Sequence, residues 1–178
     1  MAPRAPVEAR YSAFHNYSMA VVAAAMVVAA VVFLARRPDS IGSLSFGDPR
    51  FLLFLLLGIS MAYYAIAGIR RALDRAPQVT VDRDGIALGF GRNRRFDWNE
   101  IQWVRLHRLS LRPQLQIGLM PETFVNADLR LSVWNLDDPL RPVRGVPAAL
   151  SLRDNGLDTK ASALLDAVRN FRPSLVKS

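Results

Sequence analysis

The pattern of apolar residues divides the chain into two parts. Two runs near the N-terminus, residues 17–35 and 51–69, contain no charged side chain, and two arginines follow each of them. A helix of this length rises about 28 Å, which is close to the thickness of the hydrocarbon core of a bilayer. Both runs therefore predict transmembrane helices, joined by a short loop into a hairpin.

Two other interpretations explain the runs less well. Buried helices of soluble proteins are usually amphipathic, and a chain of 178 residues is too small to hide two helices that are apolar on all sides. A signal peptide has a shorter apolar core of about 7–15 residues, and residues 33–35 lack the small residue expected two positions before the last Ala of a cleavage site. We therefore expect the first run to stay in the protein as an anchor.

Arginines near the helix ends predict the orientation of the hairpin. The cytoplasmic side of a membrane protein keeps the excess of Arg and Lys in its short segments. Five arginines flank the hairpin and three lie in its loop, namely Arg4, Arg10, Arg70, Arg71 and Arg75 against Arg36, Arg37 and Arg50. This bias predicts a multi-pass protein with both termini in the cytoplasm.

Small residues four positions apart predict how the helices pack. The second helix has Gly58 and Ala62 at this spacing, and the first has Ala20–Ala24 and Ala25–Ala29. Such pairs allow two helix backbones to approach closely. We expect the two helices to pack on each other through these residues, and association with a second copy of the hairpin stays open.

From residue 78 onward, apolar and polar residues alternate, as in strands with one buried face. Asp84-Gly85 separates the alternating stretches 79–81 and 86–90 and predicts a β-hairpin, because glycine tolerates a positive φ. Further strands are expected at residues 95–98, 101–109, 115–119, 129–133 and 148–152. The apolar phase shifts within 101–109, which predicts a β-bulge or burial on both faces. Residues 121–128 and 135–147 are expected to be irregular.

The last part of the chain has helical periodicity. Apolar residues recur at helical spacing at Ala161, Leu164, Leu165, Val168 and Phe171. Asp158 or Thr159 is expected to cap the start of this helix, and Pro173 to end it.

These elements together predict an α+β protein. A two-helix transmembrane hairpin precedes an antiparallel β-barrel or sandwich of about seven strands, and a C-terminal helix caps the strands. The expected segments are an N-terminal cytoplasmic segment at 1–16, the hairpin at 17–69, a linker at 70–77, the strand domain at 78–172 and a tail at 173–178.

Short motifs follow the hairpin in a characteristic order. They are Pro77-Gln78-Val79-Thr80-Val81-Asp82, then Asp84-Gly85-Ile86, then Trp98-Asn99-Glu100-Ile101. With the C-terminal helix, this order resembles the uncharacterised bacterial two-helix membrane proteins that carry a pleckstrin-homology-like (PH-like) domain. The resemblance runs from the first helix to residue 171. It implies the PH fold, in which a helix caps two curved sheets, and a place in the bacterial inner (plasma) membrane, but no catalytic residue.

Charge and composition narrow the function further. The net charge is +8 and comes almost wholly from arginine, since Lys160 and Lys177 are the only lysines. Beside membrane helices, a basic chain indicates anionic lipid rather than nucleic acid as the neighbouring anion. The chain has no cysteine, which excludes disulfides, thiolate catalysis and cysteine-ligated metals.

Two groups of residues are candidates for a site. Trp98 and Ile101 are expected to be core residues, with Glu100 capping nearby backbone amides or pairing with an arginine, and Asp84 and Gly85 to form the turn. The basic candidates for contact with anionic lipid head groups are Arg70, Arg71, Arg75, Arg92, Arg94 and Arg95, with Arg105, His107, Arg108 and Arg112 further along. A solvated turn near the membrane explains the same arginines without a specific pocket.

Motifs for catalysis are weak. His15 and His107 are the only histidines, so a histidine-based metal site is not expected. Gly85, Gly89 and Gly91 do not form a phosphate-binding loop, and Asp137-Asp138 before a proline indicates a turn. We expect a scaffold or interaction module without cofactor that binds a protein partner at the membrane. Recognition of anionic lipid is the alternative, and an enzyme the least favoured one.

Overall fold

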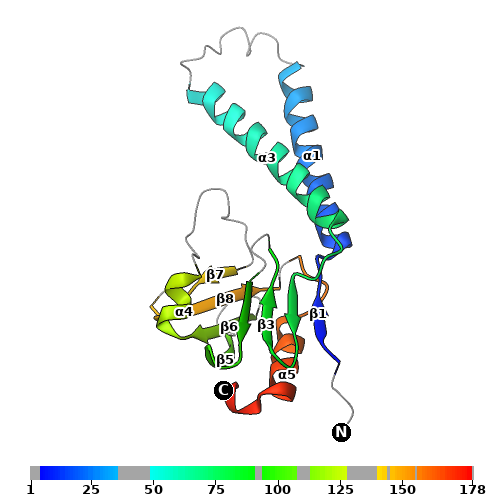
Figure 1. The fold of residues 1–178 in the computed structure, drawn as a ribbon. Helices are drawn as coiled ribbons and strands as arrows, with labels where there is room; N and C mark the ends of the chain where they lie inside the picture. The colour runs from blue at the N-terminus through cyan, green and yellow to red at the C-terminus, as the bar shows by residue number, and fades with distance from the viewer. Residues whose placement is uncertain are drawn as a thin grey trace. The chain divides into compact units, whose positions relative to one another are not determined.

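The computed structural model describes residues 5–35, 49–90, 94–107, 113–127, 140–143, 145–154 and 156–177. The chain forms two compact units (Figure 1). Tyr11–Arg75 form a helical unit, and Met1–Arg10 together with Ala76–Ser178 form a unit of strands with a C-terminal helix.

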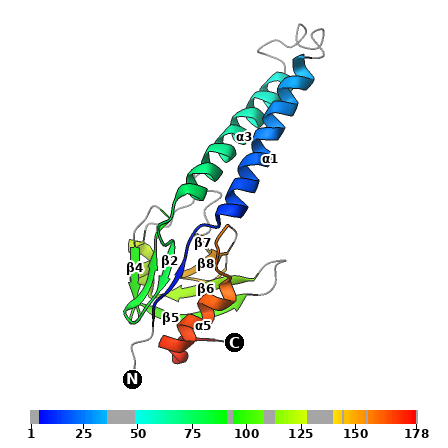
Figure 2. The ribbon, with the colours of Figure 1, turned by 90° about the vertical axis from the view of Figure 1, so that its right-hand side faces the viewer.

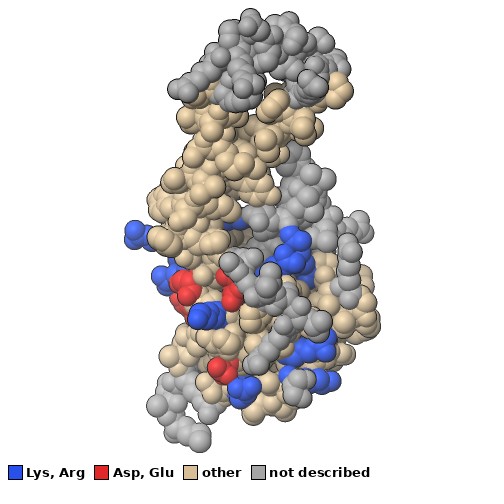
Figure 3. Space-filling view, turned by 180° about the vertical axis from the view of Figure 1, so that it is seen from behind, with Lys and Arg blue, Asp and Glu red and all other residues tan. Residues whose placement is uncertain are grey.

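The helical unit consists of α1 (Ala13–Ala35) and α3 (Pro49–Leu73). Both are long and apolar enough to cross a membrane, over Ala13–Val32 and Leu52–Leu73. Only 17% of the most apolar 18-residue stretch of α1 and 6% of that of α3 are buried, whereas a core helix of a soluble protein is mostly buried. Figure 3 shows this surface without charged side chains over most of its described length. A bilayer would cover the exposed apolar side chains, so the helices match the membrane interpretation in both length and surface.

Of the small residues expected between the two helices, Ala20 is buried there, and the other small residues at the contact are different from those predicted. Ala20 and Ala23 of α1 are buried, together with Asn16. A Cβ added at Gly68 would lie 2.8 Å from the Asn16 carbonyl oxygen and 3.0 Å from the Ala20 Cβ, so Gly68 is where the helix backbones approach closely. The predicted contact through Gly58 is wrong, because nothing lies within 4 Å of a Cβ there. Of the predicted small residues, Ala24, Ala25, Ala29 and Ala62 are also exposed.

One antiparallel sheet has the order β1-β2-β3-β4. Its strands are β1 (Val7–Ala9), β2 (Val79–Val81), β3 (Gly85–Leu88) and β4 (Arg94–Asp97). The Asp84-Gly85 hairpin is confirmed, and it joins β2 to β3. The positive φ expected at Gly85 is wrong, because among the described glycines only Gly145 and Gly156 have a positive φ. Asp82 Oδ1 accepts the backbone N–H groups of Asp84 and Gly85 at 2.9 and 3.1 Å. A Cβ at Gly85 would collide with the Phe96 carbonyl on β4, so this position requires glycine.

The strand β1 was not expected. Residues 1–16 were assigned to a separate cytoplasmic segment, but Val7, Glu8 and Ala9 pair with Val81, Thr80 and Val79. Three residues with one β-branched side chain carry almost no periodicity, and the pairing partner lies some 70 positions away. The N-terminus therefore belongs to the strand domain.

The second antiparallel sheet has the order β5-β6-β8-β7. Its strands are β5 (Ile101–His107), β6 (Gln114–Leu119), β7 (Leu140–Pro142) and β8 (Ala149–Arg153). The predicted bulge is confirmed by a register shift between Ile101 and Trp103. The strand β7 corrects the expectation that residues 135–147 are irregular throughout.

The segment expected as a loop at residues 121–128 contains a short helix, α4 (Pro121–Asn126). Proline suits the first turn of a helix, because its missing N–H would have no partner there, and Glu122 favours the same end electrostatically. The strand predicted at 129–133 and the turn at Asp137-Asp138 lie outside the described residues.

The helix α5 (Ala161–Phe171) packs against β2 of one sheet and against β5 and β6 of the other (Figure 2). Leu164 and Val168 are fully buried, together with the inward side chains of both sheets. The predicted cap is wrong. Asp154 Oδ2 accepts the Ala161 N–H at 3.1 Å, whereas Asp158 Oδ1 accepts the N–H of Arg10 beside β1 at 2.9 Å.

The fold is therefore α+β, with two apolar helices, two four-stranded antiparallel sheets and a C-terminal helix. Among the described residues, the two sheets are separate and do not close into a barrel. After α5, a short 3-10 helix at Pro173–Leu175 leads to Val176, which bridges in parallel to Val104 at the edge of β5.

Candidate functional site

The turn around Trp98 has a structural role in the domain. Trp98 and Ile101 are buried, and the Trp98 indole N–H donates to the Arg83 carbonyl at 2.9 Å. Glu100 Oε2 accepts the Asp97 N–H at 2.9 Å, which closes the turn between β4 and β5. The side chains of Trp98, Glu100 and Ile101 therefore stabilise the junction between the two sheets.

Arg95 makes a bidentate ion pair with Asp82. The two terminal guanidinium nitrogens, Nη1 and Nη2, donate to the two carboxylate oxygens at 2.9 Å. The hydrogen bonds from Arg95 hold the pKa of Asp82 below its ordinary value, against the opposing effect of partial burial, and the backbone N–H groups of Asp84 and Gly85 act in the same direction. The same pair raises the pKa of Arg95. This arginine is bound to its own domain.

Arg94 points to the opposite face of β4 from Arg95. Its guanidinium donates to the Asn126 carbonyl at 2.6 Å and lies 5.6 Å from the centre of the Phe96 ring. Arg92, Arg108 and Arg112 lie outside the described residues. Within the described part of the chain, the predicted arginine turn therefore does not gather its cations at one point.

Three further candidates lie at the end of the hairpin and just after it. Arg70 and Arg75 are exposed, and the Arg71 guanidinium lies 5.8 Å from the centre of the Tyr11 ring. Arginines at this level of a transmembrane helix can contact lipid phosphates without any pocket. These three arginines therefore favour general attachment to the membrane surface over recognition of a particular lipid head group.

The outer face of the second sheet carries a group of polar and basic residues that the sequence had not singled out as one surface. Strand register places Arg105, Gln116, Ser151 and Arg141 side by side across all four strands. The next row contains His107, Gln114 and Arg153. We call these seven residues the basic face.

The basic face is ordered by internal contacts. Arg105 Nε donates to Gln116 Oε1 at 2.8 Å, and the Ser151 hydroxyl donates to Gln114 Oε1 at 2.6 Å. The Arg105 guanidinium lies 4.9 Å from the centre of the Trp103 ring. Gln116 and Ser151 are only 4% and 7% exposed, although they lie on the face opposite the core. Buried polar side chains persist where hydrogen bonds satisfy them, as they do here.

The four strands of this sheet contain no Asp or Glu. They contribute three arginines and one histidine to one face. The alternation of polar and apolar residues in each strand could have indicated a polar face. Only the register of strands as distant as residues 105 and 153 shows that the cations share it.

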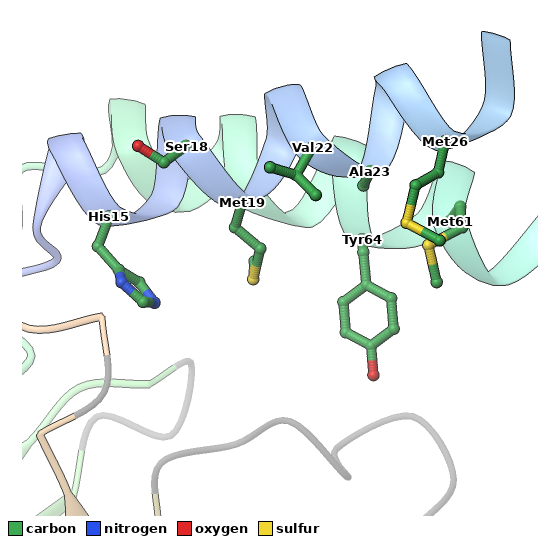
Figure 4. A pocket seen from close by; sticks show the side chains of 8 residues that line it. All are labelled: His15, Ser18, Met19, Val22, Ala23, Met26, Met61 and Tyr64. Carbon is green, nitrogen blue, oxygen red and sulfur yellow. The ribbon is translucent and has the colours of Figure 1, made fainter. Parts of the chain in front are cut away.

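The helical unit has an apolar groove of about 430 Å³ (Figure 4). Met19, Met26, Met61 and Tyr64 line it, and His15 lies at one end. The groove offers almost no polar contact, so it suits an apolar chain and gives no indication of catalysis.

Within the described residues, no group of three His, Asp or Glu side chains is placed to hold a metal ion. Comparisons of the chain with protein families, curated proteins and solved structures found no match.

Proposed function

We propose that this protein is a membrane-anchored interaction module of the bacterial inner membrane. Its two helices span the bilayer, and its strand domain, a PH-like fold, stands at the cytoplasmic face and binds a protein partner without catalysis. Anionic lipid recognition through the arginine turn is less well supported, because Arg94 and Arg95 are engaged within the domain.

The observation that carries the proposal is the pairing of β1 with β2. Ala9 lies opposite Val79 in the sheet, so the strand that leads into α1 and the strand that follows α3 are neighbours. Only residues 10–12 and 74–78 connect these strands to the helices. A hairpin whose two ends enter one sheet holds its domain on a single side of the membrane by two short tethers.

The arginine distribution supports the cytoplasm as that side. The two sheets and the α5 helix that packs on both support the PH-like assignment, since a helix against two antiparallel sheets is its expected architecture. A domain held in this way needs no lipid affinity of its own to reach the membrane. Its surface is then available for a protein.

The test is affinity purification of the full chain in mild detergent after cross-linking in cells. We expect one protein to co-purify at a constant ratio to the chain. A hairpin-only variant that lacks residues 76–178 should lose this protein while still inserting into the membrane. Recovery of the same protein with the hairpin alone, or of none under several conditions, would contradict partner binding by the domain.

A further inference from the structure

We infer that the apolar groove of the helical unit binds one acyl chain of a phospholipid from the cytoplasmic leaflet, with the phosphate head group at the His15 end of the groove. This inference goes beyond the proposed function and shares with it the insertion and orientation of the two helices. It concerns the membrane part of the protein and leaves the strand domain available for a protein partner.

The groove has the depth of one leaflet. On α1 its lining extends from His15 to Met26, which is a rise of about 16 Å along an α-helix. His15 lies just before the uncharged run 17–35, and Met26 lies at the middle of that run. On α3, Met61 lies next to the middle of the run 51–69. Because the hydrocarbon core of a bilayer is about 30 Å thick, the groove begins at one surface and ends near the midplane.

This depth favours an acyl chain over a transmembrane helix of a partner or of a second copy. A helix that spans the bilayer continues into the other leaflet, whereas the acyl chain of a phospholipid ends near the midplane, as the groove does. The volume agrees with this choice. A groove of about 430 Å³ holds about fourteen methylene groups, if each takes roughly the 30 Å³ of a water molecule.

The lining of the groove differs from the rest of the helix surface. Met19, Met26 and Met61 are the only methionines of α1 and α3, and all three line the groove. Their side chains point to the same side of the helices as the Tyr64 ring (Figure 4). Methionine is unbranched and flexible, so it adapts to an apolar ligand without a fixed shape.

The polar end of the groove suits a phosphate head group. His15 lies at this end and Ser18 follows it, and they can donate hydrogen bonds through a ring N–H and a hydroxyl. Gly68 of α3 packs against the Asn16 carbonyl, so Arg70 lies at the level of the same end. Arg70 is exposed, and a cation at this level attracts the phosphate of a phospholipid. The charge at the end of the groove is therefore complementary to the head group.

The test is native mass spectrometry of the full chain in dodecyl maltoside, titrated with palmitoyl-oleoyl phosphatidylglycerol. We expect one lipid to bind per chain at low lipid concentration. The test variant is Val22→Trp, whose larger side chain fills the groove, and the matched control is Val21→Trp, which lies outside the lining. Val22 and Val21 are 60% and 66% exposed, so neither substitution disturbs the contact between the helices.

Val22→Trp should weaken lipid binding by about tenfold or more, because loss of contact with only two methylene groups already has this effect. Val21→Trp should change binding by less than about twofold, as expected for a surface substitution. Should Val22→Trp fail to insert into the membrane, Met26→Phe replaces it, with Val28→Phe as its control, at positions that are 47% and 62% exposed.

The head-group end is tested by Arg70→Gln. This variant should weaken binding of phosphatidylglycerol by up to about fivefold, because one cation near the phosphate is lost. Palmitoyl-oleoyl glycerol, which has the same chains but no phosphate, should bind more weakly and should not respond to Arg70→Gln. Equal responses of the two lipids would contradict a phosphate at this end.

Retention of no lipid by the unchanged chain, or equal losses in Val21→Trp and Val22→Trp, would overturn the inference. A dimer whose share falls in Val22→Trp would also overturn it, because a second copy would then occupy the groove. A protein partner that is lost in Val22→Trp would show a partner helix there instead. The proposed function is tested separately, since co-purification that depends on residues 76–178 would leave it standing whatever the groove binds.

Discussion

The two sheets of the domain differ in how they use their charged side chains. The first sheet pairs an arginine with a carboxylate that also holds a turn, so its charges stabilise the fold. The second sheet sets three arginines on one face with no acid in any of its strands. In the first sheet, Arg95 is paired with Asp82 in the adjoining turn, whereas the strands of the second sheet contain no acid.

Glycine substitutions should have the largest effect on stability, and this effect should differ between the two sheets. Gly85→Ala in the first sheet drives a Cβ into the backbone carbonyl of Phe96, which cannot move without shifting a strand, so we expect a loss of about 3 kcal/mol in stability. Gly118→Ala in the second sheet meets the Trp103 ring, which can be displaced, so about 1–2 kcal/mol is expected. Urea unfolding of the full chain in nanodiscs, followed by tryptophan fluorescence, measures both. An equal or reversed order would contradict the assignment of Gly85 to a backbone contact.

The next largest loss of stability is expected from removing the carboxylate of Asp82. Asp82 accepts two backbone N–H groups and both nitrogens of Arg95, so Asp82→Ala should cost about 2 kcal/mol. Arg95→Gln removes only the half-exposed partner and should cost about 1 kcal/mol or less. The same unfolding measurement applies. A larger effect for Arg95→Gln would show that the ion pair, and not the turn, is the main role of Asp82.

The stability given by Asp82 should depend on pH. Its pKa is lower in the folded protein than its ordinary value of 3.8, so its contribution is complete well above that value and is lost as the pH falls through the folded pKa. The stability difference between the natural chain and Asp82→Asn should therefore be constant from about pH 6 to 8 and should shrink below about pH 4. A difference that grows on acidification would contradict the direction of the shift.

The smallest expected effect on stability belongs to the basic face. Arg153→Gln should change the free energy of unfolding by about 0.5 kcal/mol or less, because the Arg153 side chain makes no hydrogen bond or ion pair with the described residues. Urea unfolding of the full chain measures this change as well. A loss of more than about 2 kcal/mol in stability would show that this arginine supports the fold.

Local patterns predicted the parts of the fold that depend on neighbouring residues. The Asp84-Gly85 turn and the apolar stripe of α5 follow from a few consecutive positions, and both were predicted. The strand β1, the role of Asp158 and the contact at Gly68 were missed, since each depends on a partner far away in the chain. The arginines of residues 92–95 looked like one cluster because they are adjacent in sequence, but alternation along β4 directs Arg94 and Arg95 to opposite faces.

The basic face was missed for the same reason, because its residues come from strands that are distant in the sequence. Arg105 and His107 were noted as basic residues, but Arg141 and Arg153 were not linked to them. Their common surface exists only when β7 and β8 pair beside β6, and pairing of distant strands leaves no local signal in the sequence.

The most direct test of the central claim, a domain held on the cytoplasmic side by two membrane-crossing helices, is labelling of single cysteines in intact cells. The chain has no cysteine of its own, so Ser45→Cys in the segment between the helices and Ser174→Cys after α5 each report one position. With a membrane-impermeant maleimide, we predict that the cysteine at position 45 reacts in intact spheroplasts and the one at position 174 reacts only after permeabilisation. Labelling of both positions on the same side of the membrane would contradict the account.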